Sequence, residues 1–203
     1  MARKVIFLDR DGTINEEVRY LHRSEELRII PGVPEALRRL RELGFLLVLV
    51  TNQAGIARGY YAEADCERLN AYLNETLRRE GAGLDRVYYC PHHPEKGIGV
   101  YRRDCDCRKP KPGMLRRAAE ELQLGRFENI PAGETVDRAH SYMLGDKRID
   151  TIAGHNFGIQ GILLGSGYGR TERELAAPGD YDAYFESMGE AVGWIEKRER
   201  DGS

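Results

Sequence analysis

Short apolar runs recur along the chain and predict the strands of a sheet. They cover residues 5–8, 45–50, 86–89, 142–144 and 159–164. The first two runs are continuously apolar rather than alternating, which is typical of strands covered on both faces of a parallel sheet. A further alternating run at residues 181–185 predicts a short edge strand. We therefore expect a sheet that is buried between two layers of helices.

Between these runs, apolar residues return every three or four positions, which predicts amphipathic helices. We expect helices at 33–43, where Gly44 provides a stop, at 62–79, at 115–124 behind Pro112, at 149–157 and at 188–197. Because strand and helix alternate, the predicted fold is α/β, with a Rossmann-like, doubly wound parallel sheet. Residues 125–140 are interpreted as a long loop, and residues 196–203 as a frayed tail.

The chain length of 203 residues indicates one domain spanning residues 1–203. A net charge of -2 leaves no basic field, so nucleic acid is not an expected partner. No apolar stretch approaches the ~20 residues that cross a bilayer, and the start of the chain lacks a signal-peptide pattern, so we expect no membrane partner and a cytoplasmic protein. No large apolar surface stripe is left over, which favours a monomer.

Carboxylate and hydroxyl side chains that could take part in catalysis follow several of the predicted strands. Asp9 comes directly after the first apolar run and Asp11 two residues later, while Thr51 and Asp146 follow two other runs. Ligands of doubly wound sheets bind beyond the carboxyl ends of the strands, at the switch in strand order. We therefore expect these side chains to gather at one edge of the sheet. Lys109, which lies in a basic loop, is expected to add a fixed positive charge there.

This set of residues is typical of phosphate-ester cleavage. A carboxylate that attacks a phosphate meets the repulsion of two anions, and a divalent cation that bridges them removes it. We expect Asp9 to attack phosphorus and form an aspartyl-phosphate. Asp11 would protonate the leaving oxygen and later deprotonate the attacking water. Asp146 would bind Mg²⁺, with Asp150 supporting it from the next turn.

The Asp9 to Gly12 string also has a plainer interpretation, as an Asp-Gly turn or a calcium loop. A calcium loop needs a Glu at its twelfth position, and counting from Asp9 that position holds Tyr20. A predicted strand, rather than a helix, precedes the motif. These features favour the phosphatase interpretation.

Three of the four cysteines lie close together in the sequence. Cys90, Cys105 and Cys107, with His92 or His93, offer three thiolates and an imidazole, which suits tetrahedral Zn²⁺. Four protein ligands leave no open position, so we expect a structural site that pins a loop over residues 90–107. The alternative is a set of free, reduced cysteines.

The order of these motifs carries a resemblance. Residues 7–15 (FLDRDGTIN), 51–59 (TNQAGIARG) and 107–110 (CRKP), followed by Gly145-Asp146, are similar to the haloacid dehalogenase superfamily, and within it to the heptose-bisphosphate phosphatases. The resemblance covers about residues 5–164. It implies Mg²⁺ as cofactor, structural Zn²⁺, and a phosphorylated sugar as the small-molecule partner. The loop between Asp11 and the first helix is short, so a large cap domain is not expected.

The resemblance also implies roles for individual residues. Asp9 and Asp11 are the catalytic pair, and Mg²⁺ is held by Asp9, by the backbone carbonyl of Asp11 and by Asp146. His92 is the histidine ligand of zinc, beside Cys90, Cys105 and Cys107. The substrate contacts implied are Glu17, Tyr20, Thr51, Asn52, Gln53, Ala54, Arg108, Lys109 and Lys147. Arg108, a planar cation, suits a second anionic group.

Two other functions stay open. Histidinol-phosphatases have the same fold and a zinc loop, although their zinc loop is shorter. Their second motif also lacks the Gly-Ile-Ala-Arg-Gly string that residues 55–59 carry here. A non-catalytic, zinc-stabilised binding module would have no reason to keep both a nucleophile and an acid. The segment 125–140 is longer than the resemblance leads one to expect and leaves local substrate contacts open.

Overall fold

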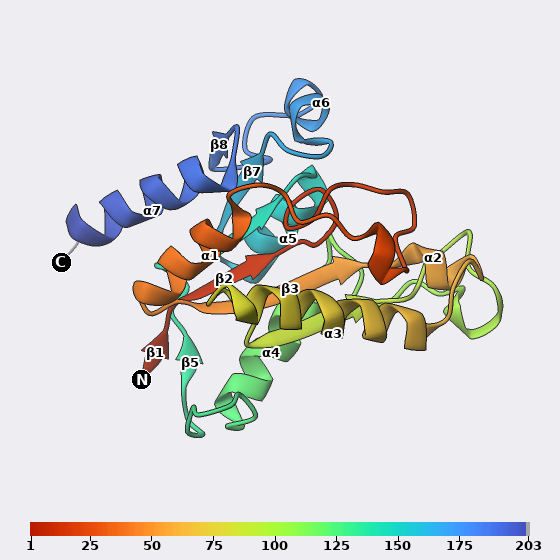
Figure 1. Ribbon diagram of the computed structural model, residues 1–203, viewed down its shortest axis with the longest axis horizontal. Coiled ribbons are helices and arrows are strands. Elements are labelled where there is room, and N and C mark those ends of the chain that lie inside the picture. The colour runs from red at the N-terminus through yellow and green to blue at the C-terminus, as the bar shows by residue number, and fades with distance from the viewer. Residues whose placement is uncertain (202–203) are drawn as a thin grey trace.

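The computed structural model describes residues 1–201 and is built on one parallel sheet (Figure 1). Its six strands lie in the order β4-β3-β2-β6-β7-β8. They are β2 (Val5–Leu8), β3 (Leu46–Asn52), β4 (Arg86–Cys90), β6 (Tyr142–Gly145), β7 (Gln160–Leu164) and β8 (Ala183–Phe185). A separate parallel pair joins β1 (Ala2–Arg3) to β5 (Thr135–Val136).

Helices cover both faces of the sheet because both faces are apolar. Ile6 and Leu8 of β2 belong to the core shared with α1 (Val33–Glu42), α3 (Glu63–Arg79) and α7 (Met188–Asp201). Val5 and Phe7, which point the other way, pack with α4 (Gly113–Gln123) and α5 (Arg148–Phe157). The continuous apolar run of β2 is thereby explained, since each side of the strand is buried.

The predicted α/β fold is confirmed, and β2 begins and ends where the sequence pattern placed the first predicted strand. Short elements were not predicted: α2 (Ala54–Ala57), α6 (Gly169–Glu174) and the 3-10 helices η1 (Ser24–Glu26) and η2 (Gly99–Tyr101). Only η1 lies between β2 and α1, which agrees with the prediction of no large cap domain.

Two sequence-based predictions need correction. Residues 125–140 are not wholly loop, because β5 lies within them and pairs with β1. The tail predicted to fray from residue 196 is helical through Asp201 in α7, where Lys4 and Arg39 pair with Glu199 and Glu196. Residues 202–203 of that predicted tail lie outside the described part of the chain.

The order of the strands creates a crevice between β2 and β6. From β2 the chain continues to β3 and β4 on one side, and from β6 to β7 and β8 on the other. This is the switch point at which open α/β sheets bind ligands. Asp9 follows β2 and Asp146 follows β6, and the backbone N–H of Asp9 donates to the Leu144 carbonyl at 3.0 Å. Neighbouring strand ends therefore bring the predicted residues together.

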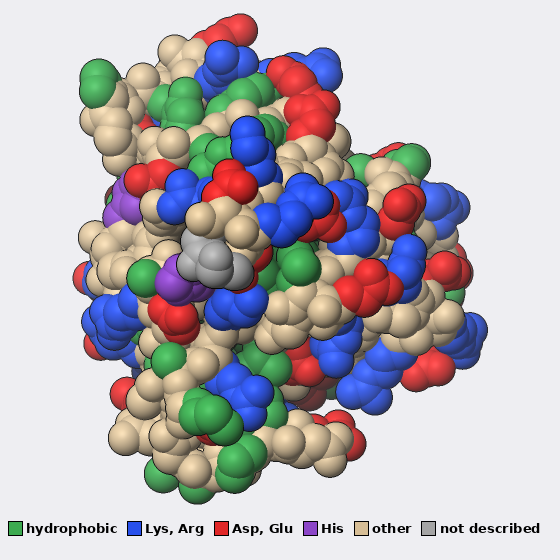
Figure 2. Space-filling view, turned by 90° about the vertical axis from the view of Figure 1, so that its left-hand side faces the viewer, with side chains coloured by type: hydrophobic (Ala, Val, Ile, Leu, Met, Phe, Trp, Pro, Cys, Tyr) green, Lys and Arg blue, Asp and Glu red, His purple; other side chains and the backbone are tan. Residues whose placement is uncertain are grey.

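Charges of both signs are mixed on the side of the molecule where the chain termini lie (Figure 2). Basic and acidic side chains alternate there without an extended field of either sign, in line with the net charge of -2. Among the described residues, no helix is long and apolar enough to cross a membrane.

Substitution of a buried leucine should cost more unfolding free energy than substitution of an exposed one. Leu49 in β3 is 0% exposed, whereas Leu124, just after α4, is 61% exposed. We expect Leu49→Ala to lower the free energy of unfolding by about 2–5 kcal/mol, because it leaves a cavity. Leu124→Ala should change it by less than about 0.5 kcal/mol. Urea unfolding of both variants measures the difference, and equal effects would contradict the assigned core.

Candidate active site

A buried lysine joins the ends of the central strands. The Lys109 side chain is 1% exposed, and its Nζ lies 2.7 Å from Asp9 Oδ1, 2.7 Å from Asp150 Oδ1 and 2.6 Å from the Val50 carbonyl oxygen. Burial opposes the charged form, but Asp150 and Asp9 outweigh it and raise the lysine pKa. Lys109 is therefore a fixed cation at the bottom of the crevice.

Asn52 holds the backbone of this lysine. The Asn52 side chain donates from Nδ2 to the Lys109 carbonyl at 3.1 Å and accepts from the Lys109 N–H at 3.1 Å. These paired hydrogen bonds fix residue 109 to the end of β3. Asn52, which the resemblance implied as a substrate contact, lines the pocket while its amide is engaged in this way.

Three buried carboxylates converge beside the lysine. One oxygen each of Asp9, Asp146 and Asp150 lies within 4.8 Å of the others. Burial is the main cause that raises the pKa of Asp146 to about 8; Lys147 opposes the rise, and Asp9 and Asp150 add to it. A divalent cation bound between these carboxylates would offset their mutual repulsion and lower the pKa of Asp146. Carboxylate oxygens are ligands that suit Mg²⁺.

Asp150 is engaged by protein groups on both oxygens. Its Oδ1 pairs with Lys109, and its Oδ2 accepts the Lys147 backbone N–H at 3.1 Å, as part of the capping box of α5. Burial, which Lys109 opposes, raises its pKa to about 6. This engagement fits a supporting role for Asp150. The Asp146 oxygens also have protein partners, because Oδ1 lies 3.4 Å from Lys147 Nζ and Oδ2 accepts the Tyr168 N–H at 2.9 Å. All three carboxylates are therefore candidates for a metal site, and the resemblance implies Asp9 and Asp146 among them.

Two glycines make room for the Asp146 carboxylate. Gly12 and Gly167 have positive φ angles of 83° and 52°, and a Cβ at either position would overlap the Asp146 side chain. Any other residue would be strained by its backbone and would also displace the carboxylate. The Gly12 of the first motif and the glycine-rich segment after β7 thus form the walls around Asp146.

Asp11 lies at the edge of the pocket and is held by four donors. Arg10 donates to Oδ1 from Nε at 3.2 Å and to Oδ2 from Nη2 at 2.9 Å. Asn15 Nδ2 and Gln53 Nε2 each donate at 3.0 Å. Burial alone would raise the pKa of Asp11, but Arg10 and these hydrogen bonds outweigh it and lower the pKa. The acid/base candidate is therefore held as an oriented carboxylate.

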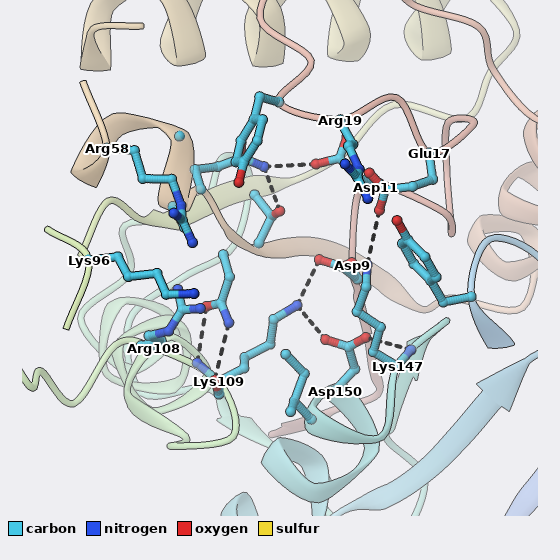
Figure 3. Close-up of a pocket in the computed structure, with 18 of the residues that line it drawn as sticks. Asp9, Asp11, Glu17, Arg19, Arg58, Lys96, Arg108, Lys109, Lys147 and Asp150 are labelled. Atoms are coloured by element: carbon cyan, nitrogen blue, oxygen red, sulfur yellow. Dashed lines mark hydrogen bonds and ion pairs between the residues drawn. The ribbon is translucent and has the colours of Figure 1, made fainter. Parts of the chain in front are cut away.

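Asp9, Asp11 and Asp150 line a pocket of about 550 Å³, whereas Asp146 is fully buried behind its lining (Figure 3). All nine substrate contacts implied by the resemblance line it: Glu17, Tyr20, Thr51, Asn52, Gln53, Ala54, Arg108, Lys109 and Lys147. Lys147 Nζ pairs with Glu17 at 3.0 Å on one side of the pocket. Arg58, Lys96 and Arg108 lie on the opposite side, so the pocket is rich in cations beyond its catalytic end.

Sequence reasoning did not select Arg58, Lys96, Arg19, Tyr61 or Tyr168 as site residues, although all five line the pocket. Arg58 and Lys96 lie on the same side of the pocket. The Ile98 backbone N–H donates to the Ala57 carbonyl at 2.8 Å, which joins the Cys/His loop (residues 90–107) to α2. Arg58 is part of the Gly-Ile-Ala-Arg-Gly string, so the resemblance offered the one signal that could have found it.

The four predicted zinc ligands converge on a point. The sulfur atoms lie 3.5 Å apart for Cys90 and Cys105 and 3.2 Å apart for Cys107 with either of them, and His92 Nδ1 lies 3.4 Å from Cys107 Sγ. Zn–S bonds of about 2.3 Å place tetrahedral ligands about 3.8 Å apart, close to these separations. Hydrogen bonding from Cys90 is the main cause that lowers the pKa of Cys107 to about 5, and the same pairing raises the pKa of Cys90, so Cys107 is the thiolate of this pair.

The second histidine has a different partner set. His93 Nδ1 accepts the backbone N–H groups of Glu95 and Lys96, at 3.2 Å and 3.0 Å, and so shapes the loop. The Cys/His cluster also reaches the pocket, because Arg108 donates from Nη1 to the His92 carbonyl at 3.1 Å. A metal at the cluster would therefore fix Arg108 as well as the loop.

Comparisons with known proteins agree with this geometry. The HAD-hydrolase-like family model matches residues 106–191. The D-glycero-β-D-manno-heptose-1,7-bisphosphate 7-phosphatase of Haemophilus ducreyi is 42% identical over 184 residues, 90% of this chain and 92% of that protein. The enzyme of the same name from Salmonella typhi is 41% identical over 205 residues, 98% of this chain and 100% of that protein.

A solved structure is similar along most of the chain. The crystal structure of the D,D-heptose 1,7-bisphosphate phosphatase from B. bronchiseptica, complexed with magnesium and phosphate, has a TM-score of 0.80 and 28% sequence identity, and the match covers 96% of this chain and 99% of that one.

Removing a thiolate should remove zinc. We expect elemental analysis to find zinc in the parent protein and none in Cys107→Ser. The variant should also be more sensitive to limited proteolysis in residues 91–106, since four ligands would hold that loop. Cys66→Ala, which changes a buried cysteine of α3 outside the cluster, is the matched control and should keep the metal. Parent protein without zinc and with a protease-resistant loop would contradict the assignment.

Proposed function

The chain belongs to the D-glycero-β-D-manno-heptose-1,7-bisphosphate 7-phosphatase family of HAD-like hydrolases, and we propose that it removes the 7-phosphate of D-glycero-D-manno-heptose 1,7-bisphosphate through an aspartyl-phosphate at Asp9. The protein is a phosphatase. The observation that carries the proposed mechanism is the position of Asp9, which lies at the switch point of the sheet, bound to Lys109 and next to Asp146.

The buried charges explain why a metal is needed. Asp9, Asp146 and Asp150 are all buried, and Lys109 is the buried cation among them. A phosphate dianion would be repelled by this excess of negative charge. Mg²⁺, held by Asp9, Asp146 and the Asp11 backbone carbonyl, would supply the positive charge that lets carboxylate and phosphate approach. The crystal structure of the B. bronchiseptica enzyme, complexed with magnesium and phosphate, supports magnesium as the cation.

Proton transfer would pair with each of two displacements at phosphorus. An Asp9 oxygen forms a bond to phosphorus while the bond to the sugar oxygen breaks, and Asp11 gives its proton to that leaving oxygen. The negative charge of the bound substrate favours this protonated form of Asp11. In the second displacement Asp11 takes a proton from water, whose oxygen attacks phosphorus and releases Asp9 and inorganic phosphate. Thr51 and Lys109 stabilise the phosphoryl oxygens.

The far side of the pocket supports a bisphosphate substrate. Arg58, Lys96 and Arg108 lie across the pocket from Glu17 and Lys147. A second phosphate on the sugar would meet these cations when the first lies against Asp9, and arginine binds such groups with its planar fork. Histidinol phosphate has no second phosphate, so this cation cluster favours the heptose bisphosphate over the histidinol-phosphatase alternative.

The zinc loop contributes to specificity in this proposal. Zinc on Cys90, His92, Cys105 and Cys107 would have no open coordination position, and its chemistry would be structural. The loop delivers Lys96 and fixes Arg108 through the His92 carbonyl. A non-catalytic binding module is disfavoured, because its pocket would not need Asp9, Asp11 and Lys109 together.

Replacing the nucleophile should stop turnover. We expect Asp9→Asn to lower kcat for phosphate release from heptose bisphosphate by on the order of a thousandfold or more, because an amide cannot form the covalent intermediate. Asp182→Asn changes an exposed carboxylate that pairs with His155 and is the control. Phosphate release is measured with Mg²⁺ and with chelator. An Asp9→Asn variant as fast as the parent would refute the mechanism.

A second experiment tests the substrate class. Arg108→Ala should lower kcat/KM for the bisphosphate by about 10-fold to 100-fold, and that for the same sugar carrying only the 7-phosphate by less than about threefold, because only the bisphosphate loses a charged partner. Arg103→Ala removes an exposed arginine of the same loop and should affect neither. Equal losses for both substrates would argue against the second-phosphate site.

A further inference from the structure

The proposed chemistry gives no role to Arg10, yet this side chain is the largest that is fully buried. Burying a guanidinium is costly unless each part of it finds a partner. Besides the two contacts to Asp11, Arg10 Nη1 donates to Asn70 Oδ1 at 2.9 Å and Nη2 donates to the Leu21 carbonyl at 3.2 Å. The cation is thus held on one side by α3 and the Leu21 loop, and on the other it grips the acid/base candidate.

We propose that Arg10 is a positioning residue that fixes the direction of the Asp11 carboxyl group, and that Asn70 of α3 in turn fixes the guanidinium. The inference rests on the proposed role of Asp11 in proton transfer. Arg10 itself does not line the pocket. It acts on the reaction only through the carboxyl group that it holds.

The contacts of Asp11 define the plane of its carboxyl group. Arg10 reaches both oxygens, and Asn15 and Gln53 add one donor each. The orientation of Gln53 is itself set, because its Oε1 accepts the Tyr61 hydroxyl at 2.6 Å, which turns Nε2 toward Asp11 and Thr51. Proton transfer requires the donor oxygen within hydrogen-bond reach of the leaving oxygen, so a swing of this group would slow the reaction.

A purely structural role for Arg10 makes a different prediction. The Arg10 carbonyl accepts the N–H groups of Thr13, Ile14 and Asn15, at 3.3 Å, 2.9 Å and 3.1 Å, and so organises the turn after β2. That role belongs to the backbone and survives a change of side chain. If the side chain only stabilised the fold, its loss would slow all substrates alike. If it aims Asp11, the loss depends on how much the leaving group needs a proton.

The test compares two leaving groups in the zinc-containing protein with Mg²⁺. The leaving group of a sugar phosphate or of glycerol phosphate is an alkoxide, which needs the proton of Asp11. The leaving group of p-nitrophenyl phosphate is p-nitrophenolate, which is stable without that proton. For Arg10→Lys we expect the first-turnover rate with glycerol phosphate to fall about 100-fold, and the first-turnover release of p-nitrophenolate to fall less than about threefold. Lysine keeps the positive charge but cannot reach both oxygens of Asp11.

Two further variants keep the test decisive. Asn70→Ala leaves Arg10 in place without its anchor and should show the same selective loss to a smaller degree, even if Arg10→Lys fails to fold. Arg39→Lys alters an arginine that grips both oxygens of Glu196 away from the pocket, and should leave both rates unchanged.

Each remaining outcome decides between the two hypotheses. Equal losses for both substrates in folded Arg10→Lys and Asn70→Ala, or no loss for either, would overturn the positioning role while leaving the phosphatase mechanism intact. A parent enzyme that turns over no phosphate ester, or an Asp9→Asn variant as active as the parent, would instead overturn the proposed function.

Discussion

One buried ammonium group holds the catalytic edge of this protein together. Lys109 reaches the Val50 carbonyl at the end of β3, Asp9 after β2 and Asp150 at the start of α5. A lysine buried without partners would lose its proton, and two carboxylates buried so near each other would not both stay charged. Asp150 and Asp9 keep the lysine charged, and the lysine opposes the rise in the pKa of Asp150 that burial and Asp9 cause. Removing the lysine would leave two buried carboxylates without their shared cation.

This arrangement leaves the site one cation short. Burial, with the neighbouring carboxylates, raises the pKa of Asp146 although Lys147 is adjacent, and the same surplus of negative charge would repel a phosphate. The backbone makes room for this buried charge. Gly12 and Gly167 lie against the Asp146 carboxylate, and a side chain at either position would overlap it. In the proposed mechanism the binding of magnesium and the binding of substrate are linked, because the metal supplies the positive charge that lets a phosphate approach these carboxylates.

Sequence patterns predicted the sheet and the strand-end residues because those features depend on local rules. Continuous apolar runs predict buried strands, and Asp9 and Asp146 follow such runs directly. The pairing of β1 with β5 was not predictable, because strands of two residues exist only through their partner. Likewise α2 and α6 are too short to show a period. Arg58 and Lys96 come to the same side of the pocket from segments far apart in the sequence, where the Cys/His loop is bonded to α2. The hydrogen bonds of Asn52 with Lys109 likewise link residues that are distant in sequence.

The covalent step at Asp9 is the central claim, and its most direct test is a crystal structure with magnesium and beryllium fluoride, which mimics a phosphoryl group on a carboxylate. The account predicts beryllium bound to an oxygen of Asp9, magnesium between that group and Asp146, and fluorine atoms facing Lys109 and Thr51. Beryllium fluoride on another carboxylate, or magnesium bound without contact to Asp9 and Asp146, would contradict it.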